Sequence, residues 1–142
     1  MNILALSGDT DATIAQIRLQ RPLSALSQRT GWPLRLKSFH DCSGADLRWA
    51  DVLIVQRGAS RRAWRWLQRM QRSGGAVVYE IDDLLTQMPA HLEQFAAVQA
   101  GRTWLLRCLA AADAVAASAQ VLHERLARQG HYDDELQAAD AR

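Results

Sequence analysis

Short apolar runs alternate along the chain with stretches in which apolar residues recur every three to four positions. Continuous or alternating apolar runs of four to six residues are typical of strands, and the longer periodic stretches are typical of helices that cover a sheet. The order of the two kinds predicts an α/β fold: a single Rossmann-like domain with a parallel sheet of about five strands and helices on both faces. The expected strands are residues 2–7, 34–39, 51–55, 76–81 and 114–117, and the expected helices are residues 14–26, 60–72, 91–111 and 118–128.

Polar, glycine and proline residues predict where these elements end. Asp11 or Thr10 is expected to cap the first helix, and Pro22 to kink or divide it. Gly130 is expected to end the last helix. The sequence thus predicts one domain over residues 1–130 and a polar tail over residues 131–142, either a frayed helix or a disordered end.

Candidate binding residues follow three of the expected strands. In open α/β sheets, ligands bind outside the carboxyl ends of the strands, so the loops there are expected to form one rim. Gly8 and Asp9 follow the first strand, Arg57 follows the third, and the pair Asp82-Asp83 follows the fourth. The backbone N–H groups, the guanidinium and the carboxylates suit phosphate groups and sugar hydroxyls.

Each of these features also has a purely structural interpretation. Residues 7–10 can be a turn and helix cap, and Arg57 can pair with a loop carboxylate. Asp82-Asp83 can be an acidic turn that also caps the next segment. Residues 7–10 do not form the GxGxxG fingerprint of dinucleotide-binding sites. His91 follows the acidic pair and is either a helix-start residue or a further residue of the rim.

Composition narrows the classes of function. A net charge of +2 gives no overall field toward nucleic acid, so no nucleic-acid partner is expected. We expect the protein to be cytoplasmic. The histidines and the two cysteines have no metal-ligand spacing, so no metal is expected. Residues 61–72 hold five arginines and two tryptophans. We interpret them as a sheet-covering helix with a solvated face, leaving an anionic membrane surface, a partner protein or nucleic acid open for this helix.

Four segments together resemble the N-terminal half of bacterial GT-B glycosyltransferases that act on surface polysaccharides. They are "IRLQRPLSAL", "ADVLIVQRG", "GGAVVYEIDDLLTQMP" and "CLAAADAVAASAQVLHERLARQG", which occur in the same order across nearly all of residues 1–130. The resemblance implies an acceptor-side domain whose strand ends bind a sugar or glycan acceptor. The substrate-binding residues that it implies are Gly8, Asp9, Arg18, Arg57, Asp82 and Asp83.

The resemblance also implies a nucleotide-sugar donor and transfer without a metal or other cofactor. In that family a second domain holds most of the donor, and after Gly130 this sequence departs from the pattern. We therefore expect no transfer by this chain alone, whether it is a piece of a larger enzyme or a short protein that lost the reaction. Nothing singles out a catalytic base. A stand-alone binding or protein-interaction module is the alternative, and a homo-oligomer is left open.

Overall fold

The structure, a computed structural model, describes residues 1–128, and the predicted polar tail at 131–142 lies outside the described residues. Five parallel strands form one sheet in the order β2-β1-β3-β4-β5. This confirms the predicted single Rossmann-like α/β domain. The strands are β1 (Ile3–Ser7), β2 (Leu34–Ser38), β3 (Val52–Gln56), β4 (Ala76–Ile81) and β5 (Ala114–Ala117).

The core lies on one face of the three central strands. Leu4 is in register with Leu53, and Leu53 is in register with Val77, so these fully buried side chains form a row across the sheet. Leu6, Val55 and Tyr79 form the next row by the same pairing. Because alternate residues of a strand face opposite sides, this face takes every second residue of each strand.

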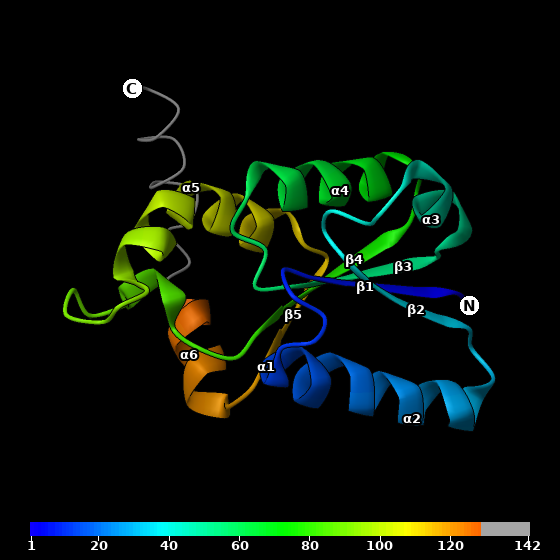
Figure 1. Cartoon of the computed structure of the whole chain (residues 1–142), viewed down its shortest axis with the longest axis horizontal. Helices are drawn as coiled ribbons and strands as arrows, with labels where there is room; N and C mark the ends of the chain where they lie inside the picture. Colours follow the sequence, from blue (N-terminus) through cyan, green and yellow to red (C-terminus); the bar gives the residue numbers. More distant parts are fainter. Residues whose placement is uncertain (129–142) are drawn as a thin grey trace.

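Helices cover both faces of the sheet. In Figure 1, α3, α4 and α5 lie on one side, and α1, α2 and α6 lie on the other. The helical segments are α1 (Thr13–Ala15), the π-helix η1 (Gln16–Gln20), α2 (Arg21–Thr30), α3 (Gly44–Trp49), α4 (Arg61–Arg72), the 3₁₀ turn η2 (Leu85–Gln87), α5 (Phe95–Ala111) and α6 (Gln120–Arg128). No helix within the described residues is long and apolar enough to cross a membrane.

The first helical region differs from the prediction. Its N-cap is Ala12, which makes no side-chain capping bond, so the expected cap by Asp11 or Thr10 is wrong. Asp9 instead accepts a hydrogen bond from the backbone N–H of Asp11 at 2.9 Å. Pro22 was expected to kink or divide the helix, and the helical region is indeed divided there. The wider η1 turn ends just before it, and Pro22 lies in the first turn of α2. Proline has no N–H to continue the α-helical bonding pattern, which accounts for a break at this point.

Helix α3 was not predicted, although its start carries a clear signal. Ser43 Oγ accepts a hydrogen bond from the backbone N–H of Asp46, and the Asp46 carboxylate accepts one from the backbone N–H of Ser43. Arg35 and Lys37 of β2 add ion pairs to the same buried carboxylate at 3.0 and 2.9 Å. The hydrogen bonds from Ser43 and the charge of Lys37 hold the pKa of Asp46 well below its usual range.

The arginine-rich helix α4 packs against the sheet as predicted. Its buried side chains are Ala63, Leu67 and Met70, whereas Arg61, Arg62 and Arg65 are exposed. The indole N–H of Trp66 donates to the carbonyl of Phe39 at 3.0 Å. One tryptophan of the helix therefore holds the loop after β2, and the arginines form its solvated face.

Because two thiols are buried, we expect the protein to lose stability at alkaline pH. Burial raises the pKa of Cys108 from 9.0 to about 12, and burial next to Asp46 raises that of Cys42 to about 11. The folded protein then binds these protons more tightly than the unfolded chain. The stabilisation is complete below pH 9.0 and is lost as the pH rises toward the folded-state pKa.

Above pH 9.0 each thiol is expected to lower the free energy of unfolding by up to about 1.4 kcal/mol per pH unit. Urea unfolding of the wild type and of Cys108→Ala between pH 7 and pH 10 measures this slope. The variant is expected to have the shallower slope, and equal slopes in the two proteins would contradict the assignment.

Candidate functional site at the carboxyl edge of the sheet

The predicted loops meet at one edge because the strands are parallel and β1, β3 and β4 are neighbours. Gly8 and Asp9 follow β1, Arg57 follows β3, and Asp82 and Asp83 follow β4. The prediction that these strand ends form a single rim is thus confirmed as a matter of topology. Their side chains, however, take different parts in it.

A buried polar network ties the ends of the three central strands together. Ser7 Oγ donates to Gln56 Oε1 at 3.0 Å, and Gln56 Nε2 donates to Glu80 Oε2 at 3.0 Å. All three side chains are almost fully buried. Buried polar groups of this kind are costly unless each has a partner, so the network fixes the positions of the strand ends.

Arg18 closes this network from the helical layer. It lies in the π-helix η1, and its Nη2 is 2.7 Å from Glu80 Oε1 while its Nε donates to the same oxygen at 2.8 Å. The structure therefore places Arg18 as the partner of a buried carboxylate. It lines none of the three pockets described below, in contrast to the other five predicted substrate-binding residues.

Sequence reasoning missed Glu80. It was read as one position of an apolar strand, whereas its carboxylate joins Arg18 to Gln56. The signal was available, because a glutamate within the buried strand "AVVYEI" requires a partner. The identity of the partner was not available, since Arg18 is 62 residues away in the sequence.

Arg57 has an unusual backbone conformation at the centre of the rim. Its φ is 48°, the one positive φ at a non-glycine residue among those described. Such a conformation costs about 1 kcal/mol or more and is found disproportionately at functional sites. The backbone N–H of Arg57 donates to the carbonyl of Glu80 at 3.0 Å, which attaches the loop to β4.

The Arg57 side chain pairs with Asp82. Its Nε lies 3.0 Å from Asp82 Oδ1, but the angles are not those of a hydrogen bond, and this buried oxygen has no hydrogen-bond partner in the described part of the chain. No described residue accepts a hydrogen bond from the terminal nitrogens of Arg57. The pair is thus held by charge, and the terminal nitrogens of Arg57 keep hydrogen-bonding capacity.

The two aspartates have separate roles. Asp83 Oδ1 accepts a hydrogen bond from the backbone N–H of Leu84 at 2.7 Å, and the Asp83 carbonyl accepts one from Leu85 at 2.9 Å. Asp83 therefore builds the acidic turn that was one of the open interpretations. Neither aspartate caps η2, whose N-cap is Leu84 without a side-chain capping bond. Asp82 is the member of the pair that faces Arg57.

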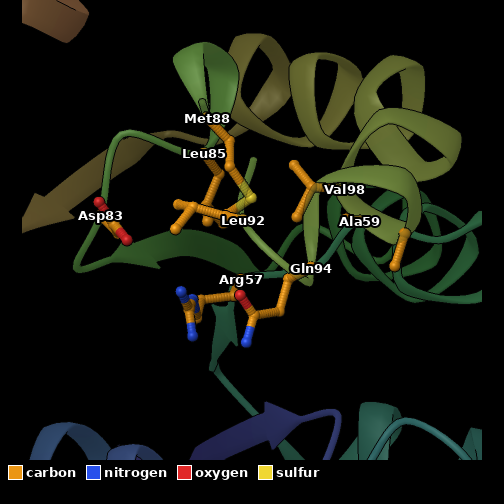
Figure 2. Close-up of a pocket in the computed structure, with 9 residues that line it drawn as sticks. Arg57, Ala59, Asp83, Leu85, Met88, Leu92, Gln94 and Val98 are labelled. Atoms are coloured by element: carbon orange, nitrogen blue, oxygen red, sulfur yellow. The ribbon is translucent and has the colours of Figure 1, made fainter. Parts of the chain in front are cut away.

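Two pockets share Arg57. A smaller one of about 210 Å³ lies at the end of β1 and includes Gly8, Asp9 and Gln56 in its lining. A larger one of about 520 Å³ lies between Arg57 and the start of α5 (Figure 2). Arg57 is thus the cation that a ligand in either pocket can reach.

A third hollow of about 320 Å³ lies on the other side of the acidic pair. Asp82, Asp83, Ser118 and Arg125 contribute its polar lining. Ser118 Oγ donates to the carbonyl of Asp82 at 2.9 Å, which links the start of α6 to the turn after β4. Asp83 lines both this hollow and the larger pocket, so it lies between the two.

Among the described residues, no three histidine, cysteine, aspartate or glutamate side chains are grouped so that they could hold a metal ion. His91 lies in the turn before α5 but does not line the three pockets, so it is not placed in the rim. Arginine, carboxylate and amide groups at this edge can act both as donors and as acceptors of hydrogen bonds with hydroxyl groups.

No protein-family model matches the chain, and no curated protein sequence matches it at a significant level.

Proposed function

We propose that the chain is the acceptor-binding half of a nucleotide-sugar-dependent glycosyltransferase that works on a surface polysaccharide or glycan in the cytoplasm. The observation that carries this proposal is Arg57, which lines two pockets at the carboxyl edge of a Rossmann-like sheet and pairs with Asp82. The unused terminal donors of Arg57, together with the carboxylate and amide groups that line the same two pockets, suit a sugar, which both donates and accepts hydrogen bonds.

The position of the pair agrees with the proposal. In open α/β sheets, ligands bind outside the carboxyl ends of the strands. The strained backbone of Arg57 supports a binding role, because a loop selected for stability alone would avoid a positive φ at arginine. Gly8 and Asp9, next to the same cation, extend the surface available to an acceptor.

The division of labour follows from the resemblance to GT-B enzymes. The donor would be held mainly by a second domain facing this edge, with basic residues and helix N-termini stabilising the leaving diphosphate. Arg57 is the candidate on this side of the cleft for holding the acceptor. We assign no catalytic base.

Substitution of Asp82 tests the proposal. Asp82→Ala in the intact gene product is expected to lower sugar transfer at least tenfold. It is expected to change the free energy of unfolding by no more than about 1 kcal/mol, because partly exposed ion pairs contribute little to stability. The measurement is the incorporation of labelled sugar from nucleotide sugars into a glycan and lipid extract of the source cells, alongside a urea melt. A variant that is less stable but transfers normally would show that Asp82 only holds the turn.

An interaction module is the second candidate, supported by the exposed arginines of α4. In that case Arg65→Glu combined with Arg69→Glu would abolish binding to a partner protein, whereas Asp82→Ala would have no effect. As a glycosyltransferase half, the chain is expected to show the opposite pattern, with transfer lost in Asp82→Ala and kept in the arginine double variant. The same two variants thus decide between the candidates.

A further inference from the structure

The larger pocket lies between the turn after β4 and the first turns of α5. Its volume of about 520 Å³ is within the range of small-molecule sites, which is roughly 300 to 1,000 Å³. Its walls come from three separate parts of the chain: the loop after β3, the segment 83–92 and the start of α5. Such a pocket exists only in the folded domain, and the polar rim described above forms one end of it.

One side of the pocket is apolar. Leu85, Met88, Leu92 and Val98 line it, and Figure 2 shows their side chains directed toward a common space. Leu92 is 40% exposed, so its side chain is open to a ligand. Apolar side chains around an open pocket of this size favour a ligand with an apolar portion.

The other end of the pocket is polar but has no excess of positive charge. Arg57 and Gln94 lie next to each other there, with Asp83 farther along the rim (Figure 2). The charge of Arg57 is already balanced by Asp82, and Asp83 adds a further negative charge. An anionic head group would therefore meet a net repulsion, whereas hydroxyl groups find donors on Arg57 and Gln94 and acceptors on Gln94 and Asp83.

We propose that this pocket binds a neutral glycoside with an apolar aglycone, the aglycone lying among Leu85, Met88, Leu92 and Val98 and the sugar lying against Arg57. The role of this glycoside as the sugar acceptor rests on the proposed function. The binding itself does not, because it follows from the shape and polarity of the pocket. The acceptor class is thereby narrowed from any glycan to one that carries an alkyl or aryl group.

Binding of octyl β-D-glucoside to the chain of residues 1–142 tests the inference. Titrations below the micellar concentration, followed by amide and methyl NMR shifts, are expected to show saturable 1:1 binding at Met88, Val98 and the Arg57 loop. Methyl β-D-glucoside has the same sugar without the chain and is expected to bind at least tenfold more weakly. Octyl phosphate has the same chain with an anionic head and is also expected to bind at least tenfold more weakly.

Two substitutions in the pocket and one outside it give the controls. Ala97→Trp places a bulky side chain at an exposed position of the lining and is expected to weaken octyl glucoside binding at least tenfold without affecting the fold. Val98→Asp is expected to weaken octyl glucoside binding as well, because it makes the apolar side of the pocket polar. Val121→Asp makes the same change in the hollow beyond the acidic pair and is expected to leave the affinity unchanged.

Three results would overturn the inference. The first is equal affinity for octyl and methyl glucoside, and the second is equal or tighter binding of octyl phosphate. The third is a concentration-dependent dimer, seen in sedimentation, in which the amides of Leu92 and Val98 are protected from hydrogen exchange. A second copy of the chain would then occupy the pocket. No donor is present in these titrations, so saturable binding with no sugar transfer by the intact gene product would refute the proposed function alone.

Discussion

Glu80→Gln is expected to lower the free energy of unfolding by about 3 kcal/mol, because it breaks a buried ion pair and leaves a charged partner behind. The Glu80 side chain is 6% exposed and that of Arg18 is 29% exposed, which places the loss toward the lower end of the range for such pairs. An amide cannot restore the ion pair. With Gln56 as it stands, the NH₂ group of the new side chain faces a donor, on Arg18 or on Gln56, and it avoids this only if the Gln56 amide also turns over.

A double-mutant cycle with Arg18→Met isolates the pair. If Arg18 acts chiefly on Glu80, the double variant is expected to be more stable than the sum of the single changes predicts, by about 1 kcal/mol or more. Denaturant unfolding of the four proteins gives this coupling energy. Additive effects within about 0.5 kcal/mol would mean that Arg18 is not held by Glu80 and is free to bind a ligand, as the resemblance implied.

Gly101→Ala is expected to destabilise the domain by about 1 to 3 kcal/mol, although alanine is the better helix former. A Cβ at position 101 would lie 2.5 Å from the backbone oxygen of Ala59 and 3.0 Å from its Cβ. Because a backbone atom cannot move aside as a side chain can, α5 would have to shift. Ala59 also lines the larger pocket, so the shift is expected to weaken octyl glucoside binding as well.

Gly44→Ala is the matched control for this substitution. Gly44 is the first residue of α3, and the nearest atom to an added Cβ is the side-chain nitrogen Nη1 of Arg48 at 3.4 Å. The change is expected to be neutral or slightly stabilising in a thermal melt. A gain in stability for Gly101→Ala as large as that for Gly44→Ala would show that α5 does not pack as closely on the Ala59 loop as described.

The sheet and its functional edge could be predicted because both depend on local pattern. The apolar runs that became β1, β3 and β4 are continuous and end in glycine or charged residues, and parallel strands bring their carboxyl ends together. The candidates Gly8, Asp9, Arg57, Asp82 and Asp83 follow from that rule alone. Rules of this kind apply before any contact between distant residues is known.

The features that depend on contacts between distant segments could not be predicted. The apolar pocket forms because Met88 and Leu92, in an irregular segment, line the same space as Val98 of α5, and no periodicity indicates that arrangement. The pairing of Arg18 with Glu80 could not be predicted for the same reason, since the two residues are far apart in the sequence. Helix α3 is a different case, because the spacing of Ser43 and Asp46 is a local signal that could have been recognised.

The most direct test of the central claim compares two arginines in the intact gene product. Arg57→Gln removes the cation shared by the two pockets, whereas Arg65→Gln removes an exposed cation on α4. The measurement is the rate of labelled sugar incorporation from nucleotide sugars into the glycan extract of the source cells. The proposal predicts at least a tenfold loss for Arg57→Gln and an unchanged rate for Arg65→Gln. Equal rates for both variants and the wild type would contradict a glycosyl acceptor site at this edge of the sheet.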